Sequence, residues 1–320
     1  MRYLFLLCIS FCYLLADAHI LLYHRFNDDR YPSTSISNEE LREQFTFLKN
    51  NNYTVVELDK IIEKLEKKEA IPDKWVAITI DDNYKSFYDN GYKIFKEFNY
   101  PFTMFVYVEA TNGKYSDFMS WGKLKEISDL GKLEYHSYAH LSMVKADKDK
   151  LKKDFEKGLK LFEENLGYKP KYFSYPYGEM NEYSKELIKE YNFRAIFNQN
   201  NNGAVSEKSD IFNIDRLVTT KTATLKSLLK HRYLHVDWDE PKVYPRDNIL
   251  KSIIATVQTD KTKAKLYITD IGWRDVEIKE NKISENVNVA LGKSRVRIIL
   301  RVGDEISTKI ITKGEKSGVE

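Results

Sequence analysis

Cysteine is nearly absent from this chain of 320 residues, which contains only two, Cys8 and Cys12. Both lie in the first apolar segment, so the rest of the chain has no pair that could form a disulfide framework. Runs of one charge are also missing: 51 basic and 48 acidic residues are spread along the chain, and no polybasic arm predicts nucleic-acid binding. Stability must therefore come from an apolar core, for which a hydrophobic content of 42% is ordinary.

The first residues, MRYLFLLCISFCYLLADA, have the pattern of an export signal. One arginine precedes an apolar run from Tyr3 to Leu15, and the segment ends in Ala-Asp-Ala, a signal peptidase pattern. The run is shorter than the about 20 apolar residues that span a bilayer. The sequence predicts a signal peptide over residues 1–18 with cleavage after Ala18, and hence a periplasmic or secreted protein without stable membrane insertion. An uncleaved anchor is the alternative.

Short apolar runs alternate with longer amphipathic stretches from residue 19 to about residue 236. The runs include HILLYH, VAITID, FTMFVYV, KLEYH and YFSYP, and the stretches between them have apolar residues three and four positions apart. Asn38 and Ser120 are expected helix N-caps, and Gly167 is an expected C-cap. This alternation predicts an α/β fold of parallel βα units that close an irregular (β/α)7-8 barrel. An open, doubly wound sheet is the alternative.

The pattern changes beyond Pro245. Six segments, from SIIATVQ to EISTKIIT, alternate polar and apolar residues without a helical period, and turn residues separate them. We therefore expect a first domain over residues 19–236, a linker over 237–248 and a small β-sandwich-like domain over 249–320.

Polar residues stand where several predicted strands end. HILLY is followed by His24, VAITI by Asp81 and Asp82, and KLEY by His136, with His140 four residues later. The loops at the C-terminal ends of parallel strands meet on one rim of a barrel, so these side chains are expected to converge. Two histidines and one aspartate could then hold a divalent transition ion, while the second aspartate takes a proton from water.

Each motif also has an ordinary explanation when it is taken alone. An Asp-Asp pair is commonly a solvated turn, and His-x-x-x-His is commonly a helix face or a loop. The placement of both at strand ends, in a chain with few histidines, favours the metal site.

Three motifs, TIDDNY, HSYAH and SYPYG, occur in the order that is typical of polysaccharide deacetylases, the NodB-homology group of carbohydrate esterases. The chain resembles this family from about residue 20 to about residue 217. The resemblance implies Asp81 as the catalytic base and the backbone N–H of Tyr177 as an oxyanion donor. It implies a divalent metal, with Zn²⁺ expected first and Ni²⁺, Co²⁺ or Fe²⁺ as alternatives, held by Asp82, His136 and His140.

Two positions depart from the usual family pattern. Asn83 stands where glycine is usual, and asparagine is the other residue that best tolerates a positive φ. Ser174 stands near the place of a usual arginine, and Arg216 is expected to fill that role by pairing with Asp81. A surface ion pair is the alternative for Arg216.

The general acid is expected near the N-terminus. The usual C-terminal Leu-His motif has no clean counterpart, because LLKHRYLH offers His231 and His235 without a preceding strand. The stretch ILLYHRF instead resembles the circularly permuted branch that deacetylates poly-N-acetylglucosamine in biofilm matrix, where an N-terminal histidine is the acid. This resemblance favours His24 over His231 and His235.

The resemblance implies an enzyme that hydrolyses N-acetyl groups of a polysaccharide containing N-acetylglucosamine and releases acetate. Two other hypotheses remain open on the sequence alone. One is a catalytically silent polysaccharide-binding protein on the same fold, and the other is a peptidoglycan-directed or other amide-directed metal hydrolase.

Overall fold

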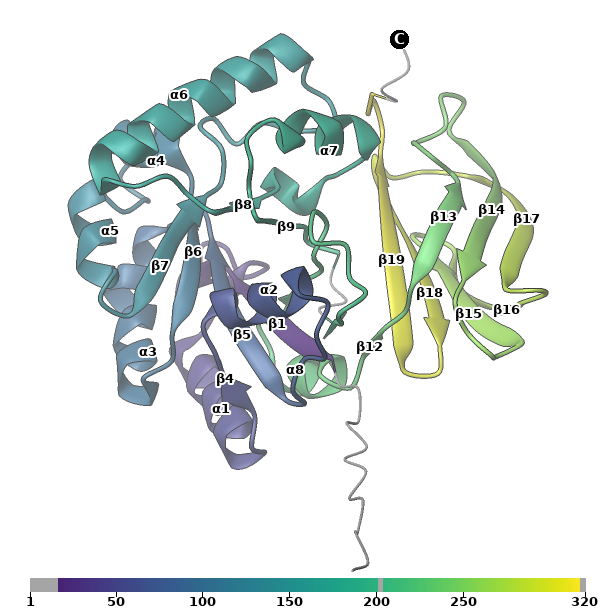
Figure 1. Cartoon of the computed structure of the whole chain (residues 1–320), viewed down its shortest axis with the longest axis horizontal. Coiled ribbons are helices and arrows are strands. Elements are labelled where there is room, and N and C mark those ends of the chain that lie inside the picture. The colour runs from purple at the N-terminus through teal and green to yellow at the C-terminus, as the bar shows by residue number, and fades with distance from the viewer. Residues whose placement is uncertain (1–16, 201–203, 317–320) are drawn as a thin grey trace, which may run out of the picture.

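The chain folds into an α/β lobe followed by an all-β lobe (Figure 1). The computed structural model describes residues 17–200 and 204–316. Most of the predicted signal peptide lies outside these described residues, but Ala18 opens the first strand, and the Asp17 carboxylate accepts a hydrogen bond from the Tyr233 N–H at 2.6 Å. Among the described residues, no helix has the length and apolar character needed to cross a bilayer.

A mostly parallel sheet forms the first lobe. Its strand order is β10-β1-β5-β6-β7-β8-β9, with β4 beside β5 and β11 beside β1. Every residue of β1, AHILLY, is buried, as expected for a strand covered on both faces. The strands are β1 (Ala18–Tyr23), β4 (Thr54–Val55), β5 (Trp75–Asp81), β6 (Phe102–Val106), β7 (Gly131–Tyr135), β8 (Tyr172–Ser174), β9 (Ala195–Phe197), β10 (Ala204–Val205) and β11 (Leu217–Val218).

The sheet curls, and the segment 211–218 closes it by lying between the edge strand β9 and β1. The Ile214 N–H donates to the Ile196 carbonyl on β9 at 2.9 Å. A few residues later, Leu217 pairs in parallel with Leu21 on β1. The irregular barrel expected from the sequence is therefore confirmed, and the open, doubly wound alternative is wrong.

Helices cover the outer face of this sheet, and Figure 1 shows α1, α3, α5 and α6 along it. The Ser120 side chain caps α5, and Gly167 ends α6 with a φ of 82°, both as expected. The expected cap at Asn38 is wrong by one position, because the Ser37 side chain accepts from the Glu40 N–H. The helices are α1 (Asn38–Asn50), α2 (Leu58–Glu66), α3 (Tyr92–Phe98), α4 (Val108–Asn112), α5 (Trp121–Ile127), α6 (Lys148–Leu166), α7 (Glu182–Lys189) and α8 (Thr222–Leu228).

Short elements complete the first lobe. The small pair β2 (Arg25–Phe26) and β3 (Ser35–Ile36) follows β1, a single π-helical turn (Phe87–Gly91) precedes α3, and a 3₁₀ turn (Pro176–Gly178) follows β8. The loops that carry the predicted motifs lie immediately after β5, β7 and β8.

The second lobe has its own apolar core between two sheets. Their strand orders are β12-β19-β18-β15-β16 and β13-β14-β17. Six of these strands match the predicted alternating segments, but the stretch 237–248, expected as a linker, begins inside a strand, since β13 pairs with β14. The strands are β12 (Arg232–Tyr233), β13 (Val236–Glu240), β14 (Ile249–Val257), β15 (Lys263–Ile268), β16 (Gly272–Glu277), β17 (Lys282–Ala290), β18 (Arg295–Val302) and β19 (Glu305–Thr312).

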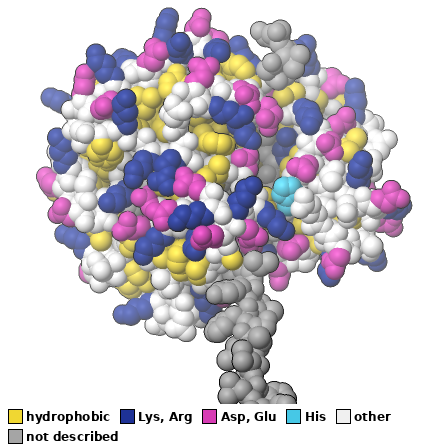
Figure 2. Space-filling model, viewed as in Figure 1, with side chains coloured by type: hydrophobic (Ala, Val, Ile, Leu, Met, Phe, Trp, Pro, Cys, Tyr) yellow, Lys and Arg dark blue, Asp and Glu magenta, His cyan; other side chains and the backbone are white. Residues whose placement is uncertain are grey.

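Charged side chains of both signs are mixed over the surface. Figure 2 shows Lys and Arg interspersed with Asp and Glu across one face of both lobes. Partly exposed ion pairs include Arg194 with Glu66 and Lys185 with Asp210. Such exposed pairs contribute little stability individually, so the two apolar cores hold the fold together.

Close packing between α6 and β7 gives a test of the first core. A Cβ atom at Gly158 would lie 2.1 Å from the Tyr135 hydroxyl oxygen and 2.9 Å from its ring carbon Cζ. Gly158→Ala should therefore lower the free energy of unfolding by about 1–3 kcal/mol, measured by urea denaturation. Gly122→Ala is the control, because the atom nearest to an added Cβ at Gly122 is Ser120 Oγ, at 3.8 Å. Its free energy of unfolding should stay the same or rise slightly. Equal stability of the two variants would contradict this packing.

Candidate metal and catalytic site

Three ligand-type atoms meet where β5 and β7 end. Asp82 Oδ1 lies 3.3 Å from His136 Nε2 and 3.3 Å from His140 Nε2, and the two Nε2 atoms are 3.2 Å apart. Asp82 and His136 are buried, and His140 is partly exposed. The structure thus brings together the three residues expected as metal ligands.

The distances between these three atoms, which form a triangle, suit a cation with tetrahedral coordination. Bonds of about 2.0 to 2.1 Å to nitrogen or oxygen place neighbouring donors of a tetrahedron about 3.3 to 3.4 Å apart. Asp82 Oδ1 is also a buried oxygen without a hydrogen-bond partner, which would be costly for a carboxylate in the absence of a positive charge. The donor set and this unpartnered oxygen both fit a divalent ion.

The backbone of β8 fixes the orientation of His136. Its Nδ1 lies 2.8 Å from the Ser174 carbonyl oxygen, which can only accept, so Nδ1 carries the proton. When the ring is neutral, as a metal ligand must be, Nε2 presents a lone pair toward Asp82 and His140. A histidine that ligates a metal is normally held in this way through its other nitrogen.

The loop between His136 and His140 is held from two sides. On α6, the buried Asp154 accepts hydrogen bonds from the backbone N–H groups of Tyr138 and Ala139, at 3.0 and 2.7 Å. Ser137 Oγ accepts from the His140 N–H at 2.9 Å. These bonds stabilise a strained loop, since Ser137 and His140 have φ values of 68° and 51°.

Asp81 does not share the triangle but pairs with Arg216. The Arg216 guanidinium donates to Asp81 Oδ1 at 2.8 Å and to Oδ2 at 2.7 Å, and its side chain is fully buried. Its other donors reach Ser174 Oγ at 2.7 Å and the Asn198 carbonyl at 2.8 Å. Arg216 is therefore no surface ion pair, and Ser174 bridges the guanidinium to Asp81, to which it donates at 3.1 Å.

Opposite charges keep both aspartates ionised. Burial alone would raise the pKa of Asp81, but the Arg216 guanidinium outweighs it and leaves that pKa below the ordinary value. Burial likewise opposes ionisation of Asp82, and His136 and His140 hold its pKa well below the ordinary value. Asp81 is thus available as a proton acceptor next to the triangle, with His136 Nε2 at 3.9 Å from its Oδ2.

His24 lies on the same rim as Asp81, because Tyr23 on β1 pairs in parallel with Ile80 on β5 and these two residues directly precede His24 and Asp81. Burial lowers the pKa of His24, and the Asp82 and Asp81 carboxylates oppose that shift. His231 and His235 lie elsewhere: the His231 carbonyl contacts His19 Nε2 at 3.1 Å, and His235 Nε2 is 3.6 Å from Asp237. The structure brings His24, and neither of the two C-terminal histidines, to the site.

Tyr177 lies in the turn after β8, beside the triangle. Its ring meets the His140 ring edge-on, with centroids 4.5 Å apart, and its side chain is 48% exposed. Tyr177 and Gly178 have positive φ values of 61° and 63°. A Cβ at Gly178 would lie 2.4 Å from the Gln199 backbone nitrogen, so this turn depends on glycine.

Asn83 takes a structural role that the usual glycine could not. Its φ is 44°, its side-chain oxygen accepts from the Tyr107 N–H at 2.7 Å, and its amide donates to Thr111 Oγ1 at 2.8 Å. These bonds tie the loop after β5 to Tyr107 at the N-cap of α4 and to Thr111 within the helix. The substitution is thus compensated locally and does not disrupt the turn that carries Asp82.

Sequence reasoning missed the supporting residues Asp154, Asn198 and Thr111. Asp154 stands inside a strongly charged helix, and Asn198 and Thr111 stand in loops or helix ends, where polar residues are ordinary. No local pattern distinguishes them. Their roles arise only from contacts between distant segments.

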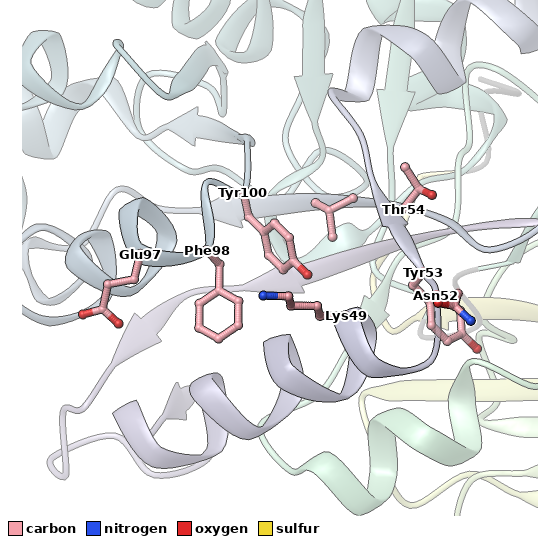
Figure 3. A pocket seen from close by; sticks show the side chains of 8 residues that line it. Lys49, Asn52, Tyr53, Thr54, Glu97, Phe98 and Tyr100 are labelled. Carbon is pink, nitrogen blue, oxygen red and sulfur yellow. The ribbon is translucent and has the colours of Figure 1, made fainter.

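A separate surface hollow lies on the outer side of the barrel, between α1 and α3. Figure 3 shows Lys49 extending toward Phe98 and Tyr100 in this hollow. None of the residues that line it carries the predicted chemistry. The residues are Lys49, Asn52, Tyr53, Thr54, Val55, Glu97, Phe98 and Tyr100.

Comparisons with known proteins agree with this geometry. The family model for polysaccharide deacetylases matches residues 68–196, which include the loops after β5, β7 and β8. A poly-beta-1,6-N-acetyl-D-glucosamine N-deacetylase of Staphylococcus aureus is 27% identical over 202 residues, covering 59% of this chain and 69% of the relative.

Solved structures share the fold. The deacetylase PplD of Streptococcus pyogenes, in complex with acetate, has a TM-score of 0.61 at 17% identity, covering 67% of this chain and 98% of that chain. IcaB from Ammonifex degensii has a TM-score of 0.58 at 23% identity, covering 67% of this chain and 97% of that chain. Each of these two matches covers about two thirds of this chain.

Metal content tests the triangle directly. Changes to groups that merely orient a metal ligand lower metal affinity by about 10- to 100-fold, so loss of a ligand should cost at least as much. We expect purified wild-type protein to bind one Zn²⁺ per chain and His136→Ala to retain little, as measured by elemental analysis after dialysis. His235→Ala, which changes a histidine outside the triangle, should bind as the wild type does. Equal metal content in His136→Ala and wild type would exclude the site.

Proposed function

The chain contains a polysaccharide deacetylase domain, and from this premise we propose that it removes N-acetyl groups from a polysaccharide of N-acetylglucosamine. The related Staphylococcus aureus protein is named for this activity on poly-beta-1,6-N-acetyl-D-glucosamine. The observation that carries the proposal is the pairing of an ionised, Arg216-bound Asp81 with a separate Asp82–His136–His140 triangle. One carboxylate is thus free for proton transfer while the other can bind a cation.

Asp82, His136 and His140 would hold the metal. Two imidazoles and one carboxylate suit Zn²⁺ best, with Ni²⁺, Co²⁺ and Fe²⁺ as alternatives. A cation held there would supply Lewis-acid chemistry, by polarising an acyl oxygen and lowering the pKa of water. Three protein ligands are typical of catalytic sites, where the remaining coordination positions serve water and substrate.

Asp81 acts as the general base. Its carboxylate accepts the proton of a water molecule as the water oxygen attacks the acetyl carbon. Arg216 and Ser174 hold the carboxylate in one orientation through three hydrogen bonds. Arg216 therefore acts by positioning Asp81 and by keeping it ionised.

Tyr177 and His24 act on the oxygen and the nitrogen of the amide bond that breaks. The Tyr177 backbone N–H donates to the oxygen on which negative charge develops. His24, in its protonated form, gives a proton to the nitrogen as the C–N bond breaks, because an amine anion is too poor a leaving group. The products are acetate and a glucosamine unit with a free amine.

We also propose that the chain has two regions with different roles and that it is exported. Residues 19–236 carry the reaction, and the β-sandwich-like region 249–320 packs against them through β12 and β19. An exported protein would meet a surface or matrix polysaccharide, which agrees with the predicted signal peptide over residues 1–18.

Replacement of the base should separate metal binding from turnover. Asp81→Asn keeps the size of the side chain but cannot accept the proton, so we expect normal Zn²⁺ content and a kcat lower by about 10²- to 10⁴-fold. Acetate release from acetylated glucosamine oligomers measures the rate. An Asp81→Asn variant with wild-type activity would remove Asp81 from the mechanism.

The general acid is tested by comparing three histidines. His24→Ala should lower kcat on the oligomers by about 10²-fold or more, since proton transfer to the amine is lost. His231→Ala and His235→Ala should retain activity, because the His231 carbonyl contacts His19 and the His235 ring faces Asp237. If His24→Ala stays active while one of the other two variants is inactive, the assignment of the acid is wrong.

A further inference from the structure

Exposed aromatic side chains gather around the candidate site. Of the seven large hydrophobic residues that are exposed in the described part of the chain, Tyr31, Tyr115 and Tyr177 are 44%, 48% and 48% exposed. They come from three separate loops, which follow β2, α4 and β8. A common location of exposed rings from distant segments indicates a binding surface.

Ring contacts connect two of these tyrosines through the site. Tyr177 contacts His140 at 4.5 Å between centroids, and His140 contacts Tyr107 at 5.5 Å. Tyr107 in turn contacts Phe118 at 5.5 Å, and Phe118 contacts the exposed Tyr115 at 6.3 Å.

A second series of contacts leads from Phe118 toward the loop that carries Asp82. The Phe118 and Tyr84 ring centroids are 4.8 Å apart, and Tyr84 follows Asp82 by two residues in the loop after β5. The Arg25 guanidinium then lies 3.5 Å from the Tyr84 centroid and 3.9 Å from the Tyr31 centroid. We call the connected rings of Tyr177, Tyr107, Phe118, Tyr115, Tyr84 and Tyr31 the aromatic arc.

Ion pairs hold the Tyr31 end of the arc in place. Arg25 is buried and pairs with Asp28 at 2.7 Å and Asp117 at 2.8 Å. Arg30 joins the same two carboxylates, at 2.8 Å and 2.5 Å. The loop is thus fixed before any ligand binds, which lowers the entropic cost of binding.

The Tyr115 end is fixed by close packing. A Cβ at Gly113 would lie 2.7 Å from Tyr115 Cε1, so the ring lies directly over the glycine. The Tyr115 N–H donates to the Ala110 carbonyl at 3.0 Å. Both exposed rings therefore stand in defined positions.

The charged groups around Tyr31 balance one another, and this bears on the ligand class. Arg25 and Arg30 pair with Asp28 and Asp117, so these four side chains leave no net charge beside the Tyr31 ring. A pyranose ring has an apolar face of C–H groups that packs well on an aromatic ring. An uncharged sugar polymer matches this surface better than an acidic or basic ligand.

We propose that Tyr31 and Tyr115 bind further pyranose units of the same chain, next to the reacting N-acetylglucosamine and on the Phe118 side of the site, so that the enzyme prefers a polymer to a single sugar. This inference rests on the proposed function. Neither tyrosine touches the reacting atoms in this account, so each contributes to substrate binding alone.

The test compares KM across substrate lengths. Tyr31→Ala and Tyr115→Ala should each raise KM for acetylated glucosamine pentamers roughly tenfold, the effect of losing one apolar ring contact. Their kcat on the pentamer, and both constants on the acetylated dimer, should stay near wild-type values. Tyr31→Phe and Tyr115→Phe, which keep the rings, should restore the pentamer KM.

Matched controls are exposed aromatics far from the arc. Tyr168 is 43% exposed and donates to the Leu133 carbonyl, and Trp273 is 49% exposed on β16 in the second lobe. Tyr168→Ala and Trp273→Ala should leave the pentamer KM unchanged. An unchanged KM in the two arc variants, or an equal loss on dimer and pentamer, would overturn the proposal.

A binding measurement keeps this test independent of the reaction. Calorimetric titration of the pentamer into Asp81→Asn, with and without Tyr31→Ala or Tyr115→Ala, needs no turnover. A weaker Kd by roughly tenfold in the double variants supports the arc, and an identical Kd refutes it. If the wild type binds the pentamer but releases no acetate, the proposed function fails while the arc stands.

Discussion

The site depends on the compensation of two adjacent buried carboxylates. Asp81 and Asp82 are 2% and 8% exposed, and an uncompensated buried charge would cost several kcal/mol. Arg216 compensates Asp81 with a bidentate pair, while Asp82 faces two imidazoles and keeps one oxygen without a partner. The protein thus neutralises one carboxylate with its own guanidinium and leaves the other for a cation. Because the two carboxylates have different partners, Asp81 can act as a base while its neighbour Asp82 acts as a metal ligand.

The barrel supplies the geometry that this separation needs. Parallel strands β5, β7 and β8 end on one rim, and the segment that closes the barrel brings Arg216 to the same place. The loops above the rim carry backbone strain, with positive φ at Asp82, His140 and Tyr177, at about 1–3 kcal/mol each. Backbone N–H groups donate hydrogen bonds to the side chains of Asp154, Asn83 and Ser137 and offset that strain, so the ligand positions are set before a metal binds.

The sequence predicts the fold because its periodicities are strong. The apolar runs that become β1, β5, β6 and β7 and the long amphipathic stretch of α6 leave little ambiguity. Short elements such as α8 and the strand β13 were not expected, since tertiary pairing rather than local pattern creates them. The site motifs stand at strand ends and can be found from sequence. Their support from Asp154 and the path of Arg216 into the barrel depend on long-range contacts, which spacing does not reveal.

The proposed chemistry depends on one divalent ion bound by Asp82, His136 and His140. X-ray absorption spectroscopy on Zn²⁺-loaded protein tests this most directly, because imidazole ligands leave a characteristic scattering pattern from their outer ring atoms. The account predicts nitrogen and oxygen neighbours at about 2.0 to 2.1 Å, with the scattering of two imidazoles. A spectrum without imidazole scattering, or one unchanged in His140→Ala, would show that the ion lies elsewhere and would contradict the account.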